Sequence, residues 1–70
     1  MEPNVVEKEL LKDVQDLAEQ VFEDRALASE WMARPNLALG GNSPVISCSS
    51  VRGAQEVRRV LWAIAYGGVV

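Results

Sequence analysis

Residues 31–44 read WMARPNLALGGNSP, and this stretch divides the chain into two helical parts. Pro35 ends the first part, because a proline disfavours the helical conformation of the residue before it. Turn-forming residues are denser here than elsewhere in the sequence, and the pair Gly40–Gly41 permits positive φ angles. Ser43 followed by Pro44 is typical of a helix N-cap and its first helical residue. The stretch therefore predicts the end of one helix, a loop, and the start of a short new helix.

Apolar residues recur at helical spacing on both sides of this stretch. The first part of the chain has one apolar stripe, made by Leu10, Leu11, Val14, Leu17, Ala18, Val21 and Phe22. The last part has a second stripe, made by Val57, Val60, Leu61, Ile64 and Ala65. We predict helices over residues 5–23, 25–33, 44–48 and 51–66. The expected fold is all-α, a small bundle of three to four helices with a long N-terminal amphipathic helix.

Polar residues stand where helix caps are expected. We expect Asn4 to cap the first helix, Asp24 the second, and either Ser49 or Ser50 the last. Gly53 falls in the first turn of the last helix, where a glycine costs up to about 1 kcal/mol relative to alanine. Close approach of a neighbouring backbone is the expected reason for a glycine at this position.

The composition excludes most enzyme classes. The chain has 70 residues with one cysteine and no histidine, so catalytic triads, Cys–His pairs and Cys/His zinc sites cannot form. The carboxylates lie on the outer face of the first predicted helix, and no pattern pairs two of them in an apolar pocket for acid–base catalysis. Cys48 is expected to be a buried structural thiol. We therefore predict one small domain that is not an enzyme and binds no cofactor.

The net charge of −3 is unevenly distributed along the sequence. Residues 1–30 carry nine acids and three bases, whereas residues 31–70 carry one acid and four bases. So few arginines and lysines make direct DNA binding doubtful, because affinity for DNA depends on neutralising phosphates. The acidic part fits either a solvated helix face or an electropositive protein partner. The start of the chain lacks the pattern of a secretory signal and no apolar run is long enough for a membrane span, so we expect a cytoplasmic protein.

The two tryptophans call for different interpretations. Trp31 shares a helix face with Leu27, and its position favours the core. Trp62 lies beside the main apolar stripe of the last helix, one turn before Tyr66. Core packing and interface contact are equally compatible with that position, since tryptophan is also enriched at protein interfaces.

The order of these motifs resembles one family, the C-terminal toxin-binding domain of Xre/MbcA/ParS-type antitoxins, which accompany RES-domain toxins. The matching region spans about residues 18–70. The residues that carry the resemblance are Trp31, Pro35, Asn36, Leu39, Gly40, Ser43, Pro44, Gly53, Val57, Leu61, Ile64, Tyr66 and Gly67. The resemblance implies an antitoxin of a type II toxin–antitoxin system, which binds a toxin that consumes NAD and covers its active site. Degradation of NAD and transfer of ADP-ribose are both open as the toxin's chemistry.

The sequence departs from the family pattern at three places. Many members carry an N-terminal helix-turn-helix domain, and the residues before the first predicted helix leave no room for one. We therefore expect a single toxin-binding domain over residues 1–70, as a natural minimal form or as part of a longer chain. The segment after Ser43 is more polar than the family pattern, so a short helix is expected there. The ending Tyr-Gly-Gly-Val-Val carries one glycine more than the pattern.

The resemblance directs attention to the end of the last helix as the toxin-binding part. The residues expected to contact the toxin are Arg58, Trp62, Tyr66, Gly67, Gly68, Val69 and Val70. Arg58 is either a mimic of contacts to an anionic group in an NAD site or a solvated surface arginine. Asn36 and Gly40 are expected to shape their loop instead.

The expected partners are a cognate RES-domain toxin and, given the small core, further copies in a homodimer or hetero-oligomer. A different class of function is also open, namely a small helical adaptor or oligomerisation module with no link to toxin control. In that case the stripe of the first helix would form a seam between two copies.

Overall fold

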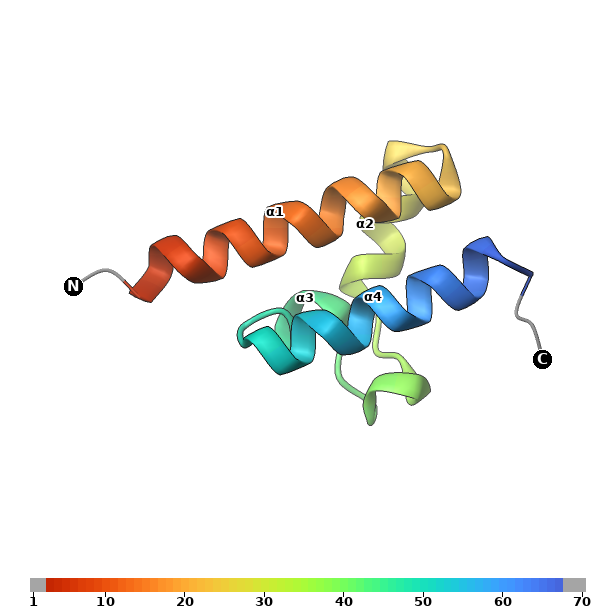
Figure 1. Ribbon diagram of the computed structural model, residues 1–70. Helices are drawn as coiled ribbons and strands as arrows, with labels where there is room; N and C mark the ends of the chain where they lie inside the picture. The colour runs from red at the N-terminus through yellow and green to blue at the C-terminus, as the bar shows by residue number, and fades with distance from the viewer. Residues whose placement is uncertain (1–2, 68–70) are drawn as a thin grey trace.

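The computed structural model describes residues 3–67, which form four α-helices, one short 3-10 helix and the turns between them (Figure 1). In chain order these are α1 (Pro3–Phe22), α2 (Arg25–Ala33), η1 (Leu37–Leu39), α3 (Pro44–Ser47) and α4 (Val51–Ala65). Residues 3–67 contain no strand, so the prediction of a small all-α bundle with a long first helix is confirmed. No helix in this part of the chain is both long and apolar enough to cross a membrane.

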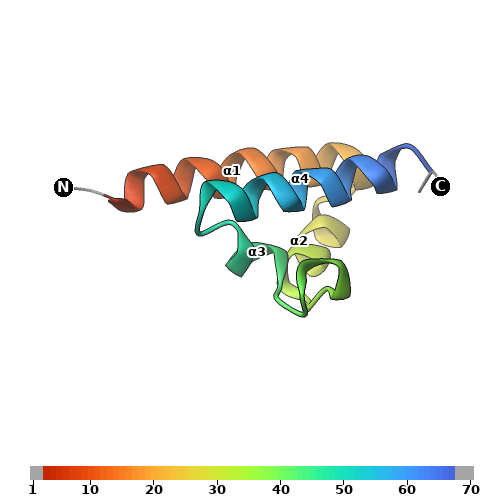
Figure 2. The same cartoon turned by 60° about the horizontal axis from the view of Figure 1, so that its bottom comes forward.

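The two long helices, α1 and α4, lie side by side and run in the same direction (Figures 1 and 2). The shorter elements α2, η1 and α3 cover one side of this pair, as Figure 2 shows. The first turns of α1 extend beyond the start of α4. This arrangement leaves the opposite side of the α1–α4 pair open to contacts with other molecules.

All four α-helical regions contribute to one core, which is why a chain this small can fold around it. The most deeply buried apolar residues are Val14, Ala18, Ala28, Met32, Cys48, Ala54, Val57 and Leu61. The remaining residues of the α1 stripe pack around this core, as predicted. The α4 stripe is right for Val57 and Leu61, and Val60 is half-buried. It is wrong for Ile64 and Ala65, because Ile64 is 40% exposed and Ala65 is exposed as well. The buried residues of α4 are Ala54, Val57 and Leu61, so the contact of this helix with the core ends before its last turn.

Polar side chains cap the first turns of α2 and α4. The Asp24 carboxylate accepts a hydrogen bond from the backbone N–H of Leu27 at 3.0 Å, and Ser50 Oγ accepts one from Gly53 at 3.0 Å. The predicted caps of α2 and α4 are therefore confirmed, with Ser50 chosen over Ser49. The prediction for Asn4 is wrong, because α1 already includes Pro3 and Asn4 is a helical residue.

Three helices end one residue earlier than predicted. The first helix ends at Phe22 because Glu23 adopts a left-handed conformation with φ of 55°, which no α-helix can continue. The Glu23 N–H still donates to the carbonyl of Glu19 at 2.8 Å. The short helix α3 ends at Ser47, and Cys48 forms its C-cap. Tyr66 is the C-cap of α4.

Gly53 marks the closest approach between α3 and α4. A Cβ atom built at this position would overlap the carbonyl oxygen of Ser47 and lie 2.8 Å from its carbonyl carbon. The predicted reason for the glycine is therefore confirmed, because only a residue without a side chain lets the two backbones meet. This contact places the end of α3 against the first turn of α4.

Candidate partner-binding surface

Two aromatic side chains form an exposed ridge at the end of α4. The rings of Trp62 and Tyr66 stack with their centroids 5.6 Å apart and an interplanar angle of 18°. Trp62 is 46% exposed and Tyr66 is 70% exposed. Of the two interpretations open for Trp62, its exposure favours contact with another molecule over burial in the core.

A groove of about 270 Å³ lies beside this ridge, between the second half of α1 and the last turns of α4. Its lining residues are Leu17, Gln20, Val21, Glu23, Trp62 and Ala65. Partner contacts were predicted only on α4 and the residues after it, whereas α1 also lines this groove. Leu17 and Val21 belong to the predicted apolar stripe of α1 and are partly buried against the core, and the stripe alone does not distinguish groove residues from core residues.

The other predicted partner-binding residues lie along the same helix or beyond it. Arg58 is exposed one helical turn before Trp62, where it lines a cleft of about 80 Å³ together with Leu10 and Asp13 of α1. Gly67 follows the ridge with φ of 79°, and its N–H donates to the carbonyl of Ile64 at 3.2 Å. Gly68, Val69 and Val70 lie outside the described residues. The structure therefore brings Trp62, Tyr66 and Gly67 together and places Arg58 further back along α4.

Asn36 and Gly40 determine the conformation of the loop that contains η1. The Asn36 side chain accepts a hydrogen bond from the N–H of Ala38 at 2.9 Å and so caps η1. The Asn36 carbonyl also accepts from Gly41 at 2.9 Å, and Gly40 takes the left-handed conformation with φ of 71°. These contacts fit the structural role expected for Asn36 and Gly40.

Four more motif residues serve packing or helix capping. Trp31 is partly buried, and its ring lies 5.8 Å from that of Phe22 at an angle of 48°. The Ser43 hydroxyl accepts from the N–H of Ile46 at 3.3 Å, and Pro44 behind it is buried. Leu39 packs against the core from η1. The motif thus fixes how the loop and α3 lie against the long helices.

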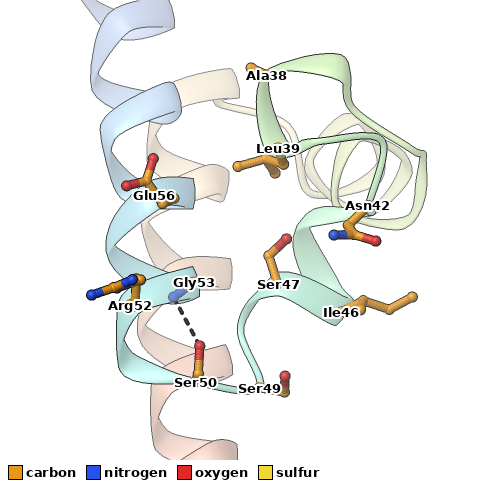
Figure 3. Close-up of a pocket in the computed structure, with 10 residues that line it drawn as sticks. All are labelled: Ala38, Leu39, Asn42, Ile46, Ser47, Ser49, Ser50, Arg52, Gly53 and Glu56. Carbon is orange, nitrogen blue, oxygen red and sulfur yellow. Dashed lines mark hydrogen bonds between the residues drawn. The ribbon is translucent and has the colours of Figure 1, made fainter.

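A second, larger groove of about 490 Å³ lies between the first half of α4 on one side and η1 with α3 on the other (Figure 3). Its residues are Ala38, Leu39, Asn42, Ile46, Ser47, Ser49, Ser50, Arg52, Gly53 and Glu56. Most of these side chains are small or polar, and Gly53 lies beside Ser47 between the two walls. This groove follows from the close contact of α3 and α4 and carries no cluster of converging charged groups.

The thiol of Cys48 takes no part in either groove. Its residue is 2% exposed, and burial raises the pKa of the thiol because the charged thiolate is disfavoured away from water. A buried, protonated thiol is a packing element rather than a nucleophile. The surface features of the domain are thus suited to binding a partner through apolar contact.

In a comparison with protein families, residues 17–67 match the antitoxin Xre/MbcA/ParS C-terminal toxin-binding domain. The matched region begins at Leu17 in the groove wall of α1 and includes α2, α3, α4 and the aromatic ridge. No curated protein and no solved structure matches the chain. The family resemblance seen in the sequence motifs is confirmed.

Proposed function

The chain belongs to the family of antitoxin Xre/MbcA/ParS C-terminal toxin-binding domains, and on this premise we propose that it neutralises a RES-type, NAD-consuming toxin by covering the toxin's active site. Membership in the family makes the chain a toxin-binding domain of an antitoxin. The class of toxin and the mode of inhibition are the proposal. A RES-type toxin uses a small substrate, so a protein segment that fills the substrate cleft is sufficient to stop it.

The observation that carries this proposal is the exposed aromatic ridge of Trp62 and Tyr66. A domain of 70 residues has little apolar area to spare for its own core, yet this ridge stays at the surface. Large aromatic side chains dominate the energy of protein interfaces because each removes a large apolar area from water. We therefore expect Trp62 and Tyr66 to make the main contacts with the toxin.

The residues after the ridge supply the occluding part in this proposal. Gly67 turns the chain at the end of α4, and Gly68, Val69 and Val70 follow it in the sequence. Glycines let a backbone approach a partner closely, and valines suit an apolar slot. Arg58 lies two turns before Tyr66, or roughly 12 Å along the helix axis. In this arrangement it contacts the rim of the toxin's cleft, where a guanidinium pairs with carboxylate or phosphate groups.

The test is coexpression with the RES-domain toxin encoded beside the antitoxin gene, scored by growth rescue and by copurification. Trp62→Ala should raise the Kd of the complex by at least about thirtyfold, because interface hot spots contribute about 2 kcal/mol or more. Leu27→Ala is the matched control, since Leu27 is 51% exposed on α2 and does not line the groove beside the ridge. Equal affinity of the Trp62→Ala and Leu27→Ala variants would remove the ridge from the interface.

Removal of Val69 and Val70 tests the occluding segment separately. We expect the truncated chain to neutralise the toxin less well while its melting temperature changes little. Equal losses of neutralisation and of stability would mean that the two valines serve packing. A stable monomer in sedimentation, with no affinity for the toxin, would refute the proposed function as a whole.

A further inference from the structure

The groove beside the aromatic ridge has a composition that selects its occupant. Its apolar lining residues are Leu17, Val21, Trp62 and Ala65. Its polar lining residues are Gln20 and Glu23. No lysine or arginine lines it. An occupant therefore needs an apolar body together with a group that pairs with a carboxylate.

The carboxylate of Glu23 has no cation partner within residues 8–67. The ion pairs in this part of the chain join Lys12 to Asp16, Arg25 to Glu19, Arg34 to Glu30, and Arg59 to Glu56. Glu23 is exposed, so its charge is satisfied by water in the free domain. A partner that covers the groove would remove this water and must then supply a cation.

The backbone conformation at Glu23 favours glycine, yet the sequence has a glutamate at this position. Glu23 is the one non-glycine residue with a positive φ in residues 3–67, whereas the other left-handed positions there are Gly40, Gly41 and Gly67. The left-handed conformation is sterically unfavourable for a residue with a Cβ atom, whereas glycine adopts it without this loss of free energy. The chain thus keeps a carboxylate at the groove where a glycine would fold more easily.

We propose that this groove receives an arginine side chain of the toxin, whose guanidinium pairs with the Glu23 carboxylate. The inference rests on the proposed function, because it assigns the groove to the same toxin interface as the ridge. The aliphatic stem of an arginine packs along Leu17 and Val21, and its planar head pairs with a carboxylate through two parallel hydrogen bonds. Arginine suits this place better than lysine, since guanidinium is more weakly hydrated and also binds the face of Trp62.

The test uses the neighbouring RES-domain toxin, inactivated by an active-site substitution, and measures the Kd of its complex with each purified antitoxin variant. Glu23→Gln keeps the shape of the side chain and removes the charge, and it should raise the Kd about tenfold. Glu9→Gln is the matched control, because Glu9 is exposed on α1, outside the groove and before residue 17. This control should change the Kd less than about twofold.

Glu23→Gly separates a binding role from a folding role. Relief of the left-handed conformation should raise the melting temperature by about 4 °C while the affinity falls as for Glu23→Gln. A substitution that stabilises the domain and weakens the complex is the result expected of a binding residue. A lower melting temperature for Glu23→Gly would overturn the inference, since the side chain would then serve the fold.

The toxin side of the pair is found by changing its surface arginines to lysine one at a time. One of these changes should weaken binding to the unmodified antitoxin and cause no further loss with Glu23→Gln. The absence of any such coupled arginine overturns the inference. If Glu23→Gln binds normally while Trp62→Ala binds weakly, the groove assignment fails and the ridge remains. If neither variant weakens binding, the proposed toxin interface itself is wrong.

Discussion

Gly53→Ala should destabilise the domain, although alanine is the better helix former. At an ordinary position in the interior of a helix, replacing glycine by alanine gains about 1 kcal/mol. Here the added methyl group would overlap the carbonyl oxygen of Ser47 and lie 3.1 Å from Ser50 Oγ. A backbone carbonyl cannot rotate away as a side chain can, so α3 must move as a unit.

The cost of that movement sets the expected magnitude. Overpacking a well-filled site costs about 1–3 kcal/mol, and moving α3 also loosens Pro44 and the buried Cys48. Because the overlap is with backbone atoms, we expect the cost to lie at the top of this range, at about 3 kcal/mol. Subtracting the gain of about 1 kcal/mol from helix propensity leaves a net loss of about 2 kcal/mol. A domain of 70 residues has a free energy of unfolding of about 3.5–10 kcal/mol, so this loss is a large fraction of its stability. The melting temperature should fall by about 8–16 °C.

Thermal unfolding followed by circular dichroism measures this loss, and Ala63→Gly provides the control. Ala63 is exposed on α4, so the reverse substitution there reports the helix-propensity term alone, about 1 kcal/mol of destabilisation. If propensity governed both sites, Gly53→Ala would raise the melting temperature by as much as Ala63→Gly lowers it. Such a rise would refute the contact between α3 and α4 as the reason for the glycine.

Three further substitutions test the loop, the core thiol and the ridge. Asn36→Ala should cost about 1 kcal/mol in denaturant unfolding because it removes the cap of η1, whereas Asn36→Asp should retain most of it. Burial raises the pKa of Cys48 above its usual 9.0, so the stability this group contributes is complete below pH 9.0 and declines as the pH rises through the raised value. Cys48→Ala should remove that part of the alkaline decline, and a pH series of unfolding curves for both proteins would detect it. Trp62→Ala should change the free energy of unfolding by less than about 2 kcal/mol, because only part of the ring is buried, and a larger loss would place Trp62 in the core.

The bounds of the helices follow closely from local sequence signals. Asp24, Ser43 and Ser50 are short polar residues directly before apolar periodic segments, and each one accepts a backbone N–H of the first helical turn. Asn4 has the same chemistry and does not cap α1, since the helix already includes Pro3. Capping signals therefore locate a helix start well between two packed elements and poorly where the helix extends past its neighbours.

The candidate site was harder to predict because it depends on how two distant helices meet. The helical spacing in α4 predicted that Trp62 and Tyr66 lie together beside the apolar stripe, and the two rings do stack there at the surface. No local signal shows that Leu17 and Val21 of α1 form the opposite wall of a groove. The relative rotation of α1 and α4 follows from packing over the whole core, which periodicity within one helix does not determine.

Two residues break a local conformational rule, and the contrast between them bears on function. Gly53 weakens the helix that contains it, and the structure supplies the compensation directly in the contact with Ser47. Glu23 takes a left-handed conformation that favours glycine, yet its carboxylate forms no ion pair within residues 8–67 and lines a groove open to solvent. Departures from local preference are expected where a compensating gain exists, in packing or in binding. Packing accounts for the first departure. For the second, the compensating gain that we propose is the ion pair with the toxin at the groove beside Trp62.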